Sequence, residues 1–187
     1  MRLIGERTLY SGWGQFKLLD VQMKDGSVIV RQIEDHGEAV AVLPYDAGRR
    51  MALLVSQPRV GPLYRGLDPY MMETAAGIID QGEEPASAIR REALEELGVR
   101  LDELEPVAMT WTASGVSSER IQLYLAPYGE PARVASGGGL ASEHEDIAVL
   151  ELPLAELAAM ADRGALTDLK TLALVLTLMR RRPELFS

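Results

Sequence analysis

The segment GIIDQGEEPASAIRREALEELGV, from residue 77 to residue 99, constrains the fold of this chain more than any other stretch. Pro85 suits the first turn of a helix, where a missing N–H costs nothing, and Gly98 suits a helix C-cap. At about 100° per residue, the helix between them carries an apolar stripe that must face a core. The stripe consists of Ala86, Ile89, Ala93 and Leu97. The segment therefore predicts one central helix packed against other secondary structure.

Three glutamates lie on an arc beside that stripe. Glu92, Glu95 and Glu96 have spacings of three and four residues, which bring side chains together on a helix. Like charges at these spacings destabilise a helix by about 0.2–0.5 kcal/mol per pair, which neighbouring arginines or a hard cation would offset. Carboxylate oxygens are preferred ligands of Mg²⁺, which usually also takes substrate phosphates and water. Taken alone, the three glutamates still fit a solvated helix face better than a metal platform.

The rest of the chain predicts strands before and after this helix and two helices at the end. Residues 16–33 contain two β-rich runs around Asp25-Gly26, a strong hairpin signal. Residues 57–69 are rich in Pro, Gly and Arg and indicate an ordered loop. Further strands are predicted at 39–45, 49–57, 70–75, 107–112, 120–126 and 146–151, with helices from near Pro153 to Gly164 and from an N-cap at Thr167 to Arg181. This order indicates an α+β or mixed α/β layout.

Composition narrows the class of function. The net charge of −9 disfavours general binding to nucleic acid or to anionic membranes, and an anionic substrate would need divalent cations as a bridge. The absence of cysteine excludes disulfides, thiolate zinc sites and thiol catalysis, and fits a reducing cytoplasm. Charges in the first seven residues interrupt any signal peptide, and the apolar run at 172–179 is shorter than the roughly 20 residues of a membrane span. We therefore expect a cytoplasmic protein.

The glutamate-bearing segment resembles the signature of the Nudix hydrolases. Its fixed positions are filled by Gly77, Glu83, Arg91, Glu92, Ala93, Glu95, Glu96, Gly98 and Val99. A match at this many fixed positions is very specific, and it reverses the preference for a solvated acidic face. The resemblance implies a Nudix fold, an α/β/α sandwich of the α+β class, with a small N-terminal β subdomain. It also implies that Mg²⁺ or Mn²⁺ supports cleavage of a diphosphate linked to a nucleoside.

The resemblance assigns roles within this segment. Glu92, Glu95 and Glu96 are the expected metal ligands, with Glu95 also catalytic, and the backbone carbonyl of Ala76 is a further ligand. The remaining motif residues are expected to support the loop and the helix; they are Gly77, Glu83, Arg91 and Gly98.

Further segments resemble the ADP-ribose and sugar-nucleotide pyrophosphatases of this family. They comprise residues 36–46, 73–80, 114–126 and 137–154, the last being especially similar to the GDP-mannose and UDP-glucose branch. Residues expected to bind substrate are Arg59, Arg65, Glu73, Ser114 and Gly115. For the two arginines, a solvated loop position is an equally good account. Ser114 stands where ADP-ribose pyrophosphatases commonly have proline, which weakens a specific ADP-ribose assignment.

A glutamate pair follows a triple glycine in the last of these segments. By resemblance, Glu143 is the expected general base, and Glu145 is a metal ligand or second base. Gly137–Gly139 have two interpretations, either a hinge that lets this stretch swing over substrate or a flexible surface loop.

These features predict hydrolysis of a nucleoside-diphosphate sugar, of the ADP-ribose, GDP-mannose or UDP-glucose type, to a nucleoside monophosphate and a sugar phosphate. The resemblance implies a homodimer in which residues 1–38 pack on the partner, while residues 39–187 form the catalytic domain. Two alternatives stay open: a Nudix hydrolase of dinucleoside polyphosphates or coenzyme A, and a catalytically silent domain that senses a nucleotide. The complete set of acidic motif residues disfavours the second.

Overall fold

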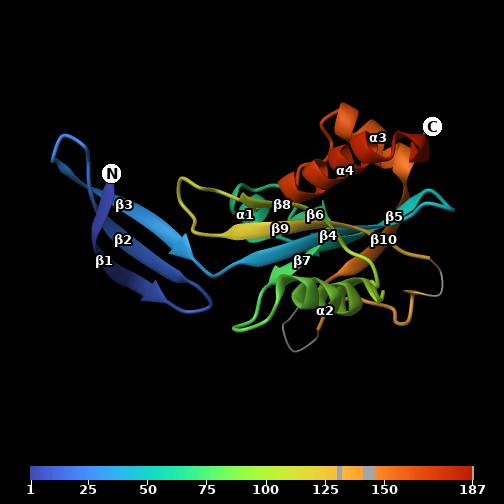
Figure 1. Cartoon of the computed structure of the whole chain (residues 1–187), viewed down its shortest axis with the longest axis horizontal. Helices are drawn as coiled ribbons and strands as arrows, with labels where there is room; N and C mark the ends of the chain where they lie inside the picture. The colour runs from blue at the N-terminus through green and yellow to red at the C-terminus, as the bar shows by residue number, and fades with distance from the viewer. Residues whose placement is uncertain (130–131, 141–145, 187) are drawn as a thin grey trace. The chain divides into compact units, whose positions relative to one another are not determined.

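The computed structural model describes residues 1–129, 132–140 and 146–186 (Figure 1). The chain divides into two compact units. The first, here called the N-terminal unit, comprises residues 1–39 and 109–121. The second, here called the larger unit, comprises residues 40–108 and 122–187. Glu143 and Glu145 lie outside the described residues.

The N-terminal unit is built on a three-stranded antiparallel sheet in the order β1-β2-β3. Its strands are β1 (Arg2–Ser11), β2 (Gln15–Gln22) and β3 (Val28–Asp35). The predicted hairpin around Asp25-Gly26 is confirmed, since β2 and β3 pair in register from Gln22–Val28 to Gln15–Asp35. The Asp25 carboxylate stabilises the turn by accepting hydrogen bonds from the backbone N–H and the hydroxyl of Ser27.

The loop at residues 112–118 belongs to this unit because it is bonded to the end of β3. The amide of Glu34 donates to the carbonyl of Val116 at 2.8 Å, and the amide of Ser118 donates to the carbonyl of Glu34 at 2.9 Å. The Ser118 hydroxyl also donates to the carboxylate of Asp35 at 2.7 Å. Ser114 and Gly115 are therefore part of the N-terminal unit.

A seven-stranded sheet forms the framework of the fold, in the order β10-β5-β4-β9-β8, with β6 paired to β5 and β7 to β4. Its strands are β4 (Ala39–Asp46), β5 (Met51–Pro58), β6 (Tyr70–Glu73), β7 (Ala75–Ile78), β8 (Glu105–Trp111), β9 (Arg120–Pro127) and β10 (Ala148–Pro153). All eight residues of β4 are buried. Burial along the whole strand is expected for a strand that is covered on both faces of the sheet.

Helices lie against both faces of this sheet (Figure 1). The helices of the described residues are α1 (Val60–Tyr64), α2 (Pro85–Leu97), α3 (Leu154–Asp162) and α4 (Leu169–Arg181), followed by the 3₁₀ turn Pro183–Leu185. Figure 1 shows α2 on one face and α3 with α4 on the other, which is the expected α/β/α arrangement. Within the described residues, no helix is long and apolar enough to cross a membrane.

Two local predictions were wrong in detail. The segment 57–69 is not loop throughout, because it contains the short helix α1, which has no buried residue. The N-cap of α4 is Asp168 rather than Thr167, since the Asp168 carboxylate accepts the backbone N–H of Thr171 at 2.9 Å. Both residue types are good N-caps, and only the backbone geometry separates neighbouring candidates.

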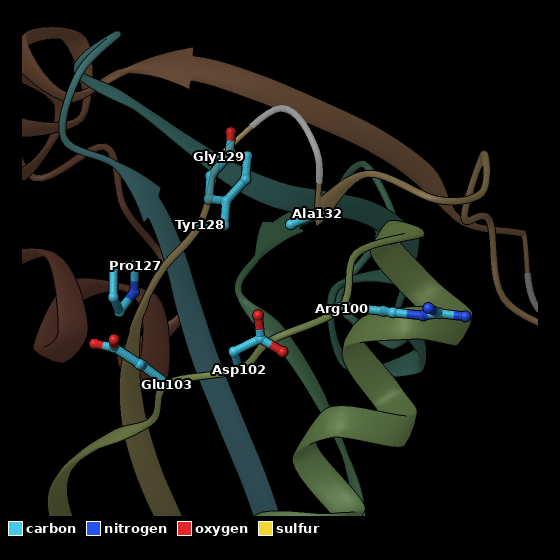
Figure 2. Close-up of a pocket in the computed structure, with 7 residues that line it drawn as sticks. All are labelled: Arg100, Asp102, Glu103, Pro127, Tyr128, Gly129 and Ala132. Carbon is cyan, nitrogen blue, oxygen red and sulfur yellow. The ribbon is translucent and has the colours of Figure 1, made fainter.

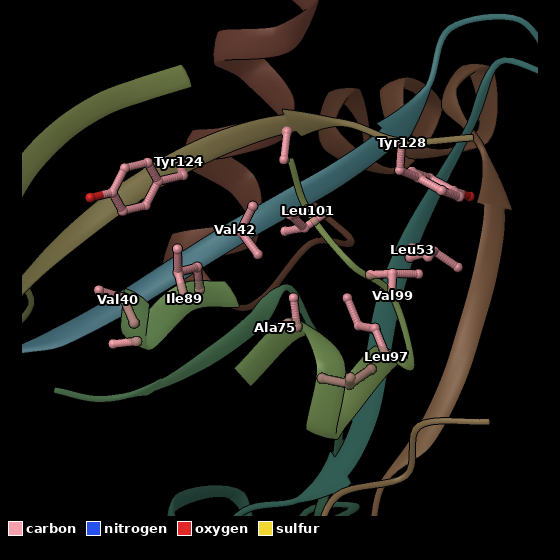
Figure 3. Close-up of a cluster of buried hydrophobic side chains, with 14 residues drawn as sticks. Val40, Val42, Leu53, Ala75, Ile89, Leu97, Val99, Leu101, Tyr124 and Tyr128 are labelled. Carbon is pink, nitrogen blue, oxygen red and sulfur yellow. The ribbon is translucent and has the colours of Figure 1, made fainter. Parts of the chain in front are cut away.

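A hydrophobic core cluster of the larger unit lies between α2 and the sheet (Figure 3). Ile89, Ala93 and Leu97 are fully buried there, as the apolar stripe predicts. Ala86, in the first turn, is only half-buried, whereas Ala88 is fully buried although it lies outside the stripe. The core therefore covers more of the helix surface than the stripe predicts.

Candidate functional site

Helix α2 presents its glutamates from its last two turns. Pro85 occupies the first turn, as predicted. The helix ends at Gly98, whose φ of +70° allows its amide to bond the carbonyl of Leu94 at 3.1 Å and that of Val99 to bond the carbonyl of Ala93 at 3.2 Å. This ending holds the final turn, and with it Glu95 and Glu96, in a defined position.

Arg91 gathers three carboxylates around one guanidinium group. Its Nη1 donates to Oε1 of Glu92 at 2.7 Å and to Oε2 of Glu95 at 3.3 Å. Its Nε and Nη2 donate to the two oxygens of Glu83 at 3.3 and 3.1 Å, and Nη2 also donates to the carbonyl of Ile78. The arginine thereby offsets the repulsion between the glutamates and ties the loop before α2 to the helix. Its hydrogen bond holds the pKa of Glu83 below the ordinary value.

Glu92 approaches Gly77 so closely that this conformation leaves no space for a side chain at residue 77. A Cβ atom at this position would overlap the carboxylate of Glu92, including its Cδ and Cγ atoms. The backbone of β7 and the side chain of Glu92 therefore pack together only because residue 77 has no side chain.

The side chain of Glu96 is buried and is bonded to the backbone of β7. It lies seven residues after Ile89 and therefore on almost the same side of the helix, which explains why only 2% of it is exposed. Its Oε2 accepts the backbone N–H of Ala76 at 3.1 Å. Ala76 and Glu96, both expected to bind metal, are thus brought into direct contact.

A second ionic cluster lies behind Glu96. Glu73, which is 2% exposed, accepts hydrogen bonds from Nε and Nη2 of Arg59 at 2.7 and 2.9 Å, and from Nζ of Lys170 at 3.2 Å. The bonds to Glu73 are the main reason that the pKa of Arg59 is raised, and the charge of Glu96 adds to the effect. Arg59 is therefore within electrostatic reach of Glu96.

Lys170 is a component of this cluster that sequence reasoning missed. Burial alone would lower the pKa of Lys170, but Asp168 and Glu73 raise it above the ordinary value. Its Nζ lies 2.7 Å from Oδ1 of Asp168, whose other oxygen caps α4 through Thr171. A lysine in the first turn of a helix is unfavourable for the helix dipole. The position of Lys170 in the first turn, two residues after Asp168, was therefore the sequence signal that this lysine has carboxylate partners.

The cluster is tied to the sheet through a hydroxyl group. The Thr171 hydroxyl accepts the backbone N–H of Thr74 at 2.7 Å, and the Thr74 hydroxyl donates to the carbonyl of Val42. Thr74 and Thr171 are both fully buried. These bonds fix the start of α4 against the junction of β6 and β7, so the positions of Lys170 and Glu73 depend on each other.

Three other described residues were expected to bind substrate. Arg65 is exposed at the C-cap of α1. Ser114 and Gly115 lie in the N-terminal unit. Their roles in substrate binding, and those of Glu143 and Glu145 in catalysis, stay predictions.

The α2 carboxylates form a candidate metal centre. Among the described residues, no group of three histidine, aspartate or glutamate side chains converges on a common point. Arg91 takes up oxygens of Glu92 and Glu95, and Glu96 bonds to Ala76. The donors are nevertheless oxygen atoms from neighbouring turns of one helix, which suits a hard divalent cation.

A hollow of about 240 Å³ lies elsewhere in the larger unit (Figure 2). It is lined by Arg100, Asp102, Glu103, Pro127, Tyr128, Gly129 and Ala132. None of these residues belongs to the α2 cluster or to the cluster around Glu73. This hollow therefore does not mark the candidate site, which is described by its charge network.

Comparison with known proteins identifies the family to which the chain belongs. Residues 35–175 match the NUDIX domain. GDP-mannose pyrophosphatases of Cronobacter sakazakii and Citrobacter koseri are 36% and 35% identical to the chain, covering 87% and 83% of it and 85% and 82% of their own lengths. The crystal structure of an ADP compounds hydrolase has the same fold, with a TM-score of 0.78 at 18% identity over 98% of this chain and 94% of that one. The chain belongs to the Nudix family and is an enzyme of its pyrophosphatase group.

Proposed function

We propose that this enzyme hydrolyses the diphosphate bond of a nucleoside-diphosphate sugar, with GDP-mannose the first candidate. The products would be a nucleoside monophosphate and a sugar phosphate. The observation that carries the proposal is the pair of α2 carboxylates organised by Arg91, together with the cations Arg59 and Lys170 that share Glu73 within electrostatic reach of Glu96. The GDP-mannose pyrophosphatases that resemble most of the chain support this choice of substrate over other diphosphates.

The acidic cluster supplies the ligands for divalent cations in this proposal. Glu92, Glu95, Glu96 and the carbonyl of Ala76 would hold Mg²⁺ or Mn²⁺. A bound divalent cation supplies charge neutralisation of the diphosphate and a more acidic water. Arg91 keeps Glu92 and Glu95 together before the cation binds, so the unfavourable like-charge contact does not have to be formed on binding.

Arg59 and Lys170 would bind the non-reacting oxygens of the diphosphate. Two cations held by one buried carboxylate are already ordered, so binding an anion loses little side-chain entropy. Glu73 has its oxygens occupied by these cations and almost no exposed surface, so we assign it a positioning role behind Arg59. Glu143 remains the proposed general base, with Glu145 as a second base or ligand.

A homodimer is part of the proposal. The N-terminal unit exposes large apolar side chains on its strands and on the turn between β1 and β2; they include Leu3, Leu9, Tyr10, Trp13, Val28 and Val30. A group of this kind on a small sheet is typical of a surface covered by another chain. Light scattering during gel filtration measures the mass directly, and a monomer of 20.4 kDa would contradict this part.

The test of the substrate is a panel of GDP-mannose, UDP-glucose, ADP-ribose, a dinucleoside polyphosphate and coenzyme A. Each is incubated with Mg²⁺, with Mn²⁺ and with chelator, and the released phosphate esters are separated by ion exchange. We expect cation-dependent release of GMP and mannose 1-phosphate to be fastest. Faster cleavage of the polyphosphate or coenzyme A would reject the nucleotide-sugar assignment. Binding of a nucleotide without turnover would indicate a silent sensor.

A further inference from the structure

In the structure, the triple glycine lies against the C-terminal end of α2 and is bonded to its backbone. Residues 132–139 run along the C-terminal end of α2, with Val99 bridged to Arg133 and the amide of Arg100 bonded to the carbonyl of Ala132 at 2.9 Å. The amides of Val134 and Ala135 both donate to the carbonyl of Gly98, at 2.9 and 3.1 Å. A segment with this many backbone bonds to its neighbour is held in place.

The glycines themselves bond to the two glutamates of the last turn. The amide of Gly138 donates to the carbonyl of Glu96 at 2.9 Å, and that of Gly139 donates to the carbonyl of Glu95 at 3.0 Å. The last four carbonyls of a helix have no partner within the helix and must find one elsewhere. Glu95 and Glu96 therefore have their backbones bonded by this segment and their side chains directed to the candidate metal centre.

Glycine is required here by close packing as well as by backbone conformation. Gly137 has a φ of +70°, and a Cβ atom on it would meet the backbone of α2, lying 2.7 Å from the carbonyl carbon of Leu97. A Cβ atom on Gly98 would in turn lie 2.8 Å from the amide nitrogen of Gly137. The two backbones thus touch at a place where no side chain fits.

We propose that Gly137–Gly139 form a clamp on the last turn of α2 that positions the carboxylates of Glu95 and Glu96 for divalent cations. This inference rests on the proposed function, because it assumes that these carboxylates bind the cation. It assigns Gly137 a positioning role, and it differs from both a hinge and a flexible surface loop in requiring that the segment stay bonded to α2.

The clamp is tested by Mn²⁺ titration of the full chain, followed by electron paramagnetic resonance, for wild type, Gly137→Ala and Gly164→Ala. Gly164 ends α3 with a φ of +69°, and no atom lies within 4 Å of a Cβ built there, so this variant carries the same conformational strain without contact with α2. We expect Gly137→Ala to weaken Mn²⁺ binding by about 10–100-fold, the usual effect of disturbing the support of a metal ligand. We expect Gly164→Ala to bind as wild type does. A folded Gly137→Ala variant with unchanged affinity would overturn the clamp.

Hydrogen exchange of the wild type tests the same inference without a variant. The clamp predicts slow exchange at the amides of Gly138 and Gly139, in the range of the strands that surround α2, whereas a hinge or a free loop predicts rapid exchange and would overturn it. The outcome is separable from the fate of the proposed function. A wild-type chain that neither binds Mn²⁺ nor cleaves any diphosphate refutes the function, whereas a wild type that does both, beside a Gly137→Ala variant of equal affinity, refutes only the clamp.

Discussion

Replacing Glu73 by glutamine probes the ionic cluster behind α2. The carboxylate of Glu73 accepts three hydrogen bonds from two cations, and its side chain is only 3% exposed. Glutamine has the same size but only one acceptor oxygen, so its NH₂ group must face a cationic donor. Hydrogen bonds to charged groups contribute about 1.5–3 kcal/mol each, and breaking a buried ion pair costs about 3–5 kcal/mol.

Two features of the structure place the Glu73→Gln effect at the lower end of these ranges. The side chain of Arg59 is 39% exposed and gains water when its partner is lost, while Lys170 keeps its bond to Asp168. We therefore expect a loss of about 2–3 kcal/mol in the free energy of unfolding. With a slope of about 2 kcal/mol per M, the urea midpoint should fall by roughly 1–1.5 M.

Glu105→Gln is the matched control for this measurement. Glu105 also accepts bonds from two cations, Arg181 at 2.5 Å and Arg182 at 3.3 Å, but its side chain is 33% exposed. An ion pair of this kind contributes about 0–1 kcal/mol. Equal shifts for Glu73→Gln and Glu105→Gln, or a Glu73→Gln midpoint within error of wild type, would refute the view that Glu73 organises a buried hub. We further expect Glu73→Gln to raise KM, because Arg59 and Lys170 lose their common anchor.

Three further predictions concern the neighbouring charges. Gly77→Ala should displace the Glu92 carboxylate and weaken Mn²⁺ binding by about 10-fold or more in a titration, and unchanged affinity would show that this close approach is unimportant. In Arg91→Lys, the ammonium group cannot replace the guanidinium hydrogen bonds to both Glu83 and Glu92, so thermal unfolding should show a loss of about 1–2 kcal/mol in the free energy of unfolding. Wild-type stability of this variant would contradict the bridging role of Arg91. The hydrogen bond from Arg49 holds the pKa of Glu151 below its ordinary 4.5, so this stabilisation is complete above about pH 4.5 and is lost as the pH falls through the lowered folded-state pKa. Urea unfolding should therefore show a larger defect of Arg49→Met at pH 7 than at pH 3, and a defect independent of pH would contradict the sign.

Local sequence signals predicted the parts of the fold that depend on neighbours along the chain. Pro85 and Gly98 mark the ends of α2 because their effects act within one turn of the backbone. The hairpin around Asp25-Gly26 follows for the same reason. The spacing of the α2 glutamates also indicated their grouping, although it did not show that Glu96 would be buried, which depends on how far the core extends around the helix.

Local sequence signals could not predict the contacts between segments that are distant in the sequence. Lys170 lies 97 residues from Glu73, and no periodicity connects them. Arg59 was selected by its position in the loop before the motif and Glu73 by the resemblance to known pyrophosphatases, but only the folded chain shows that Arg59 donates two hydrogen bonds to Glu73. The glycines at 137–139 were interpreted from their flexibility, whereas their packing on α2 depends on the absence of a side chain.

The central claim is that the carboxylates of α2 hold the divalent cations that support diphosphate cleavage. It is tested most directly by the rate of GDP-mannose hydrolysis, with Mg²⁺ and with chelator, for wild type, Glu92→Gln and Glu84→Gln. Glu84 is an exposed residue at the N-cap of the same helix, and its side chain makes no capping bond. We predict that chelator abolishes the wild-type rate and that Glu84→Gln hydrolyses GDP-mannose at the wild-type rate. Glu92→Gln should lower kcat by at least about 100-fold while the variant remains folded, as shown by a cooperative thermal unfolding transition. A Glu92→Gln enzyme that keeps most of its activity would contradict the account.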